Sequence, residues 1–152
     1  MTAAGSTRSA LATDAEFAEF QGHLNLIFSR ARSMWKESAA RIHPELQPSG
    51  YKLLMFISRV GSSNAHEIAE RFEMDKSMIS RQVRMLEDLG LLESRPDDDD
   101  ARQRVLTATP AASEALVELR TDHAHRLRRA LAGLTNEEIT AASKVFRALS
   151  EM

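Results

Sequence analysis

Residues 75–89 read DKSMISRQVRMLEDL, and this stretch decides the fold that we expect for the whole chain. Ile79, Val83 and Leu86 recur at the spacing of one helical face, which predicts an apolar stripe against a core. Asp75 is suited to cap the start of this helix, and Gly90 to end it. A second stripe is polar and partly basic, and it consists of Ser77, Ser80, Arg81, Arg84 and Asp88. The stretch therefore predicts one short helix with an inner and an outer face.

Another short amphipathic helix is predicted directly upstream, over residues 64–72. Asn64 is a suitable cap, and Glu67, three residues on, completes the pattern of a capping box. Only about a turn of chain separates the two helices. Two short helices joined by a tight turn, with Ser and Arg outward on the second, are typical of a helix-turn-helix that reads DNA.

The periodicity changes after Gly90. Residues 91–95 are short and extended in character, and Pro96 with the run from Asp97 to Asp100 predicts a turn. Residues 102–107 then predict a returning strand. A hairpin directly after a recognition helix is the wing of a winged helix, so the predicted fold class is mainly α with a small β-hairpin wing.

The flanking sequence predicts helices that frame this middle part. Thr13 with Glu16, and Thr135 with Glu138, form capping-box patterns that open helices over residues 13–41 and 136–150. Residues 50–59, opened by Ser49, and residues 109–132 predict two more helices. One face of the helix over residues 109–132 contains Ala112, Leu116, Leu119, His123, Leu127 and Ala130.

We expect four parts in the chain. They are a flexible N-terminal arm (residues 1–12), an N-terminal helix of a dimerisation region (13–45), a winged helix-turn-helix domain (46–108) and C-terminal dimerisation helices (109–152). The first and last parts carry apolar stripes that the middle does not need. We expect these stripes to pack together across two chains, because a monomer would leave a large apolar surface in water.

The composition limits the classes of protein to which the chain can belong. The 152 residues suit one ordinary domain, and 43% hydrophobic residues can form a core. The chain has no cysteine, which fits the cytosol and excludes thiol redox sensing and thiolate metal sites. We find no apolar run of about 18 residues and no secretory signal, so we expect a cytoplasmic protein. The net charge of −2 means that any basic surface must be local.

Two stretches resemble the MarR family of bacterial transcriptional regulators. Residues 66–94, HEIAERFEMDKSMISRQVRMLEDLGLLES, resemble the family's helix-turn-helix run, and residues 100–109, DARQRVLTAT, resemble its wing motif, with Asp100 and Arg102 as the motif's Asp and Arg. The flanking helices resemble the family's dimerisation elements. The resemblance implies a homodimer on a pseudo-palindromic operator. It also implies a small effector, often phenolic or aromatic, between the dimerisation helices and the winged domain, whose binding releases a repressor.

The candidate DNA-binding residues are Lys76, Ser77, Ser80, Arg81, Arg84 and Arg102. Arg81 and Arg84 suit base edges or phosphates in a major groove. The alternative is solvated helix charges, with or without pairing to Glu87 or Asp88. Lys76, at the helix start, suits a phosphate. Arg102 suits a minor groove, with Asp100 stabilising the wing by holding the Arg102 guanidinium. The aspartates from Asp97 to Asp99 suit a solvated turn.

The candidate effector-binding residues are Phe20, His23, Trp35, Tyr51 and Phe56. Aromatic residues at helical spacing also fit a core or a dimer interface. His123 and His125 are two apart and point to different sides of a helix, and His66 with Glu70 suits a surface pair. We therefore expect no metal and no cofactor.

We expect no enzyme, because the sequence has no nucleophile elbow, phosphate-binding loop or HExxH motif. The main hypothesis is a dimeric, ligand-responsive transcriptional repressor that binds double-stranded DNA. The alternative is a winged-helix module that binds proteins without specific DNA binding. Its support is the net charge of −2 and the acidic wing turn. A steep salt dependence of binding distinguishes the first from the second.

Overall fold

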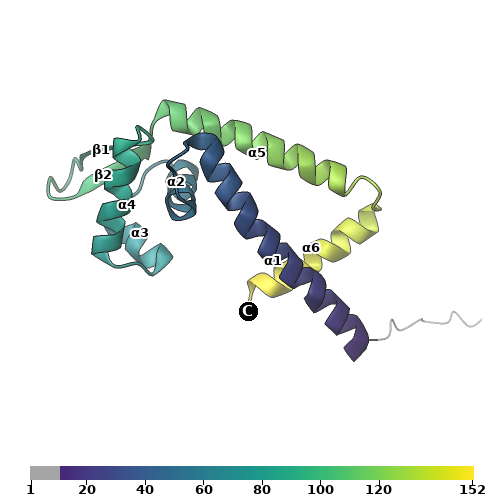
Figure 1. Ribbon diagram of the computed structural model, residues 1–152. Helices are drawn as coiled ribbons and strands as arrows, with labels where there is room; N and C mark the ends of the chain where they lie inside the picture. The colour runs from purple at the N-terminus through teal and green to yellow at the C-terminus, as the bar shows by residue number, and fades with distance from the viewer. Residues whose placement is uncertain (1–10) are drawn as a thin grey trace, which may run out of the picture.

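The computed structural model describes residues 11–152, which form six helices and one two-stranded hairpin (Figure 1). The elements are α1 (Asp14–Ile42), α2 (Pro48–Val60), α3 (Ala65–Phe72), α4 (Lys76–Asp88), β1 (Leu92–Pro96), β2 (Arg104–Ala108), α5 (Pro110–Ala130) and α6 (Asn136–Ser150). This order confirms the predicted mainly helical fold with a hairpin wing. The first ten residues of the predicted N-terminal arm lie outside the described part of the chain.

Two of the three predicted capping boxes are present. The hydroxyl of Thr13 accepts a hydrogen bond from the backbone N–H of Glu16, and the Glu16 carboxylate accepts one of 2.7 Å from the N–H of Thr13. The backbone hydrogen bond from Thr13 lowers the pKa of Glu16. Thr135 and Glu138 form the same pair at the start of α6, with distances of 2.8 and 3.2 Å. Both helices therefore begin where the sequence predicts.

The third predicted box is wrong. Asn64 caps α3 through the N–H of Glu67 at 2.9 Å, but the Glu67 carboxylate accepts a hydrogen bond of 2.8 Å from the Ser63 hydroxyl instead of reaching back to Asn64. The start of α2 is also earlier than predicted, since the helix begins at Pro48 and Ser49 lies inside it. Proline suits the first turn of a helix because its missing N–H would have no intrahelical partner there.

The hairpin strands pair antiparallel, with Leu92 opposite Ala108 and Pro96 opposite Arg104. Each strand begins one or two residues later than predicted. Ser63, between α2 and α3, adds to the outer side of β2 through two backbone hydrogen bonds with Leu106, of 3.0 and 2.7 Å. The wing is thereby fixed to the helices that precede it.

The core lies in the winged domain. Its largest fully buried side chains come from α2, α3 and α4, and they are Leu53, Leu54, Ile57, Ile68, Ile79 and Leu86. Gly50 allows α2 to approach α4 closely, because a Cβ at that position would lie 3.0 Å from the Leu46 side chain and 3.3 Å from the Gln82 side-chain oxygen. This packing determines which face of α4 points outward.

The long helices α1, α5 and α6 extend from the winged domain as an open frame (Figure 1). The inner end of the predicted α5 stripe is buried, but Leu127 near its outer end is 60% exposed. Helix α6 has no buried residue, and Phe28 of α1 and Phe146 of α6 are each more than half exposed. None of the helices within residues 11–152 is long and apolar enough to cross a membrane.

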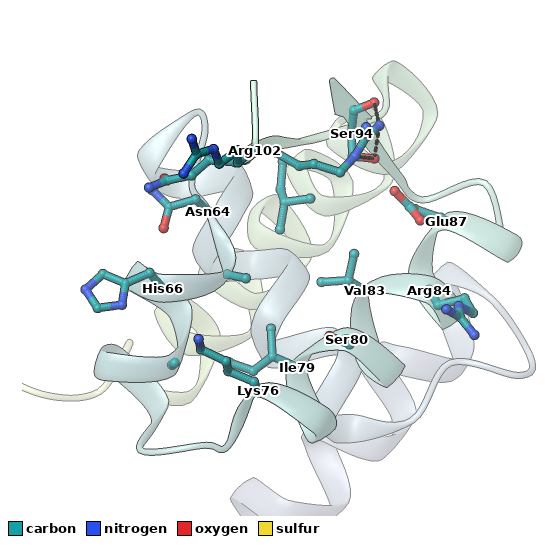
Figure 2. Close-up of a pocket in the computed structure, with 15 residues that line it drawn as sticks. Asn64, His66, Lys76, Ile79, Ser80, Val83, Arg84, Glu87, Ser94 and Arg102 are labelled. Atoms are coloured by element: carbon teal, nitrogen blue, oxygen red, sulfur yellow. Dashed lines mark hydrogen bonds between the residues drawn. The ribbon is translucent and has the colours of Figure 1, made fainter. Parts of the chain in front are cut away.

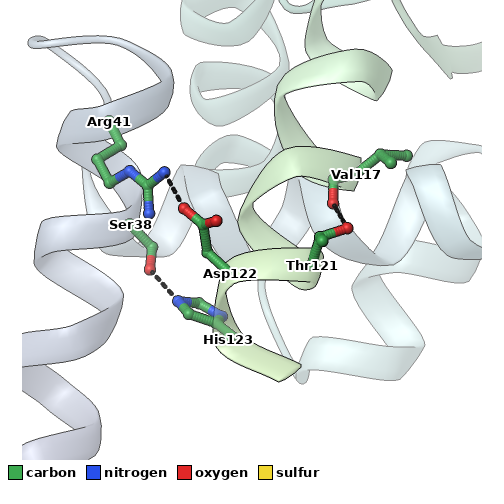
Figure 3. A network of polar contacts seen from close by, with 6 residues as sticks. All are labelled: Ser38, Arg41, Val117, Thr121, Asp122 and His123. Carbon is green, nitrogen blue, oxygen red and sulfur yellow. Dashed lines mark hydrogen bonds and ion pairs between the residues drawn. The ribbon is translucent and has the colours of Figure 1, made fainter. Parts of the chain in front are cut away.

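A polar network joins α1 to α5 close to the winged domain (Figure 3). The Arg41 guanidinium donates a hydrogen bond of 2.6 Å to the Asp122 carboxylate, and this bond lowers the pKa of Asp122. The Ser38 hydroxyl lies 3.3 Å from Nε2 of His123. These contacts join the C-terminal part of α1 to α5.

Candidate nucleic-acid interface

A tight turn connects α3 to α4. Helix α3 ends at Glu73, whose φ of 50° is left-handed and stops the helix. The Asp75 carboxylate then accepts a hydrogen bond of 2.8 Å from the N–H of Met78 and caps α4. A left-handed non-glycine residue costs roughly 1–2 kcal/mol, and the packing of both helices must offset this cost. The turn makes the two helices a helix-turn-helix unit.

Helix α4 has the two faces that the sequence predicts. Ile79 and Leu86 are fully buried, and Val83 is half-buried against the core. The predicted outward residues are exposed, and they are Ser77, Ser80, Arg81, Arg84 and Asp88. Burial of the apolar stripe therefore holds the serine and arginine side chains toward solvent.

A groove with a volume of about 600 Å³ separates α3 and α4 from the hairpin (Figure 2). Four predicted DNA-binding residues line it: Lys76, Ser80, Arg84 and Arg102. The other two, Ser77 and Arg81, lie on the exposed face of α4 beside the groove but do not line it. In the described part of the chain, none of the four basic candidates takes part in an ion pair within 4.0 Å. Arg81 and Arg84 thus do not pair with Glu87 or Asp88 here, and the alternative of solvated helix charges stays open.

Sequence reasoning missed several groove residues, among them Asn64, His66, Gln103 and Arg104. The sequence predicts a role for Asn64 only as a helix cap. Arg104 holds the hairpin together, because its guanidinium donates to the hydroxyl of Ser94 at 3.0 Å and to the Ser94 carbonyl at 2.9 Å. A basic residue diagonally across a hairpin from a serine was the available signal, but recognising it required the strand register, in which Arg104 lies opposite Pro96.

Two carboxylates of the wing turn accept hydrogen bonds from the backbone of the turn itself. The Asp97 carboxylate accepts hydrogen bonds from the N–H groups of Asp99 and Asp100, at 2.8 and 3.2 Å. The Asp100 carboxylate accepts one of 3.0 Å from the backbone N–H of Arg102. Contrary to the prediction, no ion pair within 4.0 Å joins Asp100 to the Arg102 guanidinium in the described residues; the Asp100 carboxylate stabilises the wing through the backbone of the turn instead. The Arg102 guanidinium remains at the groove.

A second cavity, of about 390 Å³, lies between α1, α2, α3 and α5. Three candidate effector-binding residues line it: Trp35, Tyr51 and Phe56. Its lining also includes four cations and no carboxylate, and the cations are Lys52, Arg59, Arg71 and Arg120. The Lys52 ammonium lies 3.9 Å from the centre of the Trp35 ring, a cation–π contact.

The other two effector candidates lie elsewhere. Phe20 borders a shallow depression on the N-terminal half of α1. His23 is exposed, and its Nε2 lies 3.7 Å from the Glu19 carboxylate on the same helix. One chain therefore does not bring all five candidates to one cavity.

The histidines make the contacts of surface and packing residues. His66 pairs with Glu70 at 3.3 Å on the surface, as predicted. Within residues 11–152, no three histidine or acidic side chains converge as metal ligands would.

A helix-turn-helix whose second helix is followed by an antiparallel hairpin defines a winged helix-turn-helix protein. The sequence model of the MarR family matches residues 46–103, from the start of the winged domain into the wing. The winged part of the chain is therefore similar to the MarR family. Members of this family are transcriptional regulators and not enzymes.

Related proteins agree with this similarity. An HTH-type transcriptional regulator of Bacillus subtilis, YxaD, is 30% identical over 98 residues, which span 64% of this chain and 66% of that protein, slightly less than two thirds of its length. The crystal structure of RV1404 from Mycobacterium tuberculosis superimposes with a TM-score of 0.77 at 16% identity, over 94% of this chain and 96% of that one. Wild-type MarR from E. coli, in its apo form, gives a TM-score of 0.61 at 16% identity, over 93% and 98%. The two crystal structures show that the fold is shared.

Proposed function

We propose that this protein is a sequence-specific DNA-binding transcriptional regulator that acts as a homodimer. The observation that carries the proposal is the outer face of α4, where Ser77, Arg81 and Arg84 are exposed beside a groove that Arg102 borders from the wing. Arginine can bond two acceptors on guanine, and small hydroxyl side chains let a helix approach base edges. Helix α4 thus suits a major groove, with Arg102 beside the neighbouring minor groove. Because its ligand would be chromosomal DNA, we propose that the protein works in the cytoplasm.

The exposed apolar faces of the long helices support a dimer. Phe17, Ile27 and Phe28 on α1 and Phe146 on α6 are each at least half exposed in a single chain. Contiguous apolar surface of this kind is usually covered by a partner. A second copy is the partner that we propose, because two-fold symmetry would place two α4 helices about 34–36 Å apart, one helical turn of DNA. Such spacing suits a pseudo-palindromic operator.

The cavity between α1, α2, α3 and α5 suits a small aromatic effector with a negative charge. Trp35, Tyr51 and Phe56 supply apolar walls, and its cations supply countercharge without a competing carboxylate. The cavity contacts the winged domain and both long helices that leave it. An effector that binds better when α4 is turned away from its DNA-bound position would release the protein from DNA. We therefore propose a repressor that such an effector releases.

Binding to DNA selected from a random library tests the proposed function. We expect one enriched inverted repeat, bound by the purified protein in a fluorescence-anisotropy assay. The four basic candidates of each protomer give at most about eight phosphate contacts per dimer, so the logarithm of affinity should fall with the logarithm of salt with a slope of up to about −7. Absence of an enriched sequence, with affinity insensitive to salt, would support the alternative of a protein-binding module.

Intrinsic fluorescence tests the effector cavity directly, because Trp35 is the only tryptophan of the chain. Titration with a panel of aromatic carboxylic acids should change this fluorescence and reduce DNA binding over the same concentration range. Lys52→Met should weaken both effects, since the Lys52 ammonium lies against the Trp35 ring. Phe20→Leu, on α1 away from the cavity, serves as the control. Release of DNA without a fluorescence change would place the effector elsewhere.

A further inference from the structure

We propose that His66 forms, with Lys76 and Arg102, a phosphate-binding site whose affinity for the DNA backbone increases as pH falls. The inference rests on the proposed DNA-binding function and adds a residue and a pH dependence to it. The ligand class is a phosphodiester of the strand that passes between α4 and the wing.

Three elements bring these side chains to one groove. His66 lies in the first turn of α3, Lys76 begins α4 and Arg102 lies in the wing, and all three line the groove. Figure 2 shows the His66 ring and the Arg102 side chain at the same edge of the groove, with the Lys76 ammonium facing that edge from below. Asn64 lies beside Arg102 there and offers a neutral amide. A site with cations on three sides suits a phosphate, which carries acceptor oxygens in several directions.

The charges around His66 explain why DNA should change its protonation. Its own helix carries Glu67, Glu70 and Arg71, and Nε2 of His66 lies 3.3 Å from the Glu70 carboxylate. Glu67 is hydrogen-bonded to Ser63 and so is partly used. The Glu70 pair lets the imidazole accept a proton without leaving an uncompensated positive charge near Lys76.

The other walls of the groove are mainly cationic. Helix α4 contributes Lys76, Arg84 and Glu87, and the hairpin contributes Arg102 and Arg104. None of the wing-turn aspartates lines the groove, so they do not replace Glu70 as partners of the histidine.

A bound phosphodiester would add negative charge where these cations converge, and this charge would favour the protonated imidazole. Histidine is the side chain that gains a proton between about pH 8 and pH 5. If DNA favours the protonated imidazole, protons must favour DNA binding by the same factor. Binding should therefore be accompanied by proton uptake and should strengthen at acidic pH.

The test is a salt titration of operator affinity at pH 8.0 and pH 5.5, with the full-length protein and the DNA sequence selected above. Each additional phosphate contact steepens the slope by about 0.9, so two protonated histidines in a dimer should steepen it by about 1.8 at pH 5.5. His66→Gln should lose the extra slope at pH 5.5, so that its salt slope is the same at both pH values. His66→Lys should show the steeper slope at both pH values.

His125→Gln, which removes an exposed histidine from α5, is the matched control and should behave like the wild type. Thermal melting of each variant at both pH values confirms that the fold is intact. If His66→Gln keeps the full pH effect, or if His66→Lys does not steepen the slope at pH 8.0, the His66 proposal is wrong while DNA binding stands. If no protein binds the selected DNA at pH 8.0, both proposals fail together.

Discussion

Replacing Arg84 by alanine tests the reading face of α4 most simply. Arg84 is exposed, lines the groove and, within the described residues, has no ion pair to lose. Alanine and arginine have similar helix propensities, so the free energy of unfolding should change by less than about 0.5 kcal/mol. The fold should therefore be unaffected, and any loss should appear in DNA binding.

The expected loss of DNA affinity follows from the contact that Arg84 would make with a base. A bidentate arginine contact to a base is worth about 1–3 kcal/mol, and a dimer on a symmetric operator has two of them, so Arg84→Ala should cost about 2–6 kcal/mol. This is roughly a 30-fold to 20,000-fold loss of affinity. Fluorescence anisotropy with the selected operator measures it, and Arg128→Ala, in the last turn of α5, controls for the change in net charge.

The reasoning is refuted if both Arg84→Ala and Arg81→Ala bind the operator as tightly and as selectively as the wild type. A uniform loss on operator and unrelated DNA would mean that Arg84 contacts phosphate rather than a base. Arg84 would then not read a base, although the outer face of α4 would still be the face that contacts DNA.

Three further predictions concern the core under α4, the contact between α1 and α5, and the dimer. Ile79→Ala removes a fully buried side chain under the reading face and should lower the free energy of unfolding by about 2–5 kcal/mol, measured by urea denaturation; a smaller loss would mean that this core is loosely packed. Asp122→Asn removes the negative charge that strengthens the hydrogen bond from Arg41. Because that bond lowers the pKa of Asp122 in the folded protein, it stabilises the fold above the carboxyl's ordinary pKa of 3.8 and this stabilisation is lost as pH falls through the lowered pKa. The variant should melt earlier than the wild type at pH 7, and the difference should vanish in strong acid; an unchanged difference there would contradict the account. Phe146→Asp puts a charge on a side chain that is 57% exposed in one chain, and should convert dimer to monomer in sedimentation analysis without unfolding it; an unchanged dimer would place the interface away from this face.

Helix caps and helix faces were predictable from the sequence where the residues that form them are close together in the chain. The Thr13 and Thr135 capping boxes and the two faces of α4 depend on residues within a few positions of one another. The box at Asn64 failed because Ser63, a neighbour with a free hydroxyl, competes for the Glu67 carboxylate. The same pattern of residue types thus has two local solutions, and packing against β2 selects between them.

The groove and the cavity depend on contacts between distant segments, which helical spacing does not specify. His66 and Arg102 line one groove from α3 and the wing, and only the tertiary arrangement brings them together. The aromatic candidates on α1 show the same limit. Trp35 faces the cavity, whereas Phe20 lies on the N-terminal half of α1 and is 41% exposed.

The central claim is that two α4 helices lie in successive major grooves of one operator. The chain has no cysteine, so Ser77→Cys creates a unique attachment point for an iron chelate that cleaves nearby DNA. We predict two cleavage clusters inside the operator, about 10 base pairs apart and related by its two-fold symmetry. The same chelate at Ser143→Cys, on exposed α6, should leave the operator uncut. Cleavage from α6, or diffuse cleavage from Ser77→Cys, would contradict the claim.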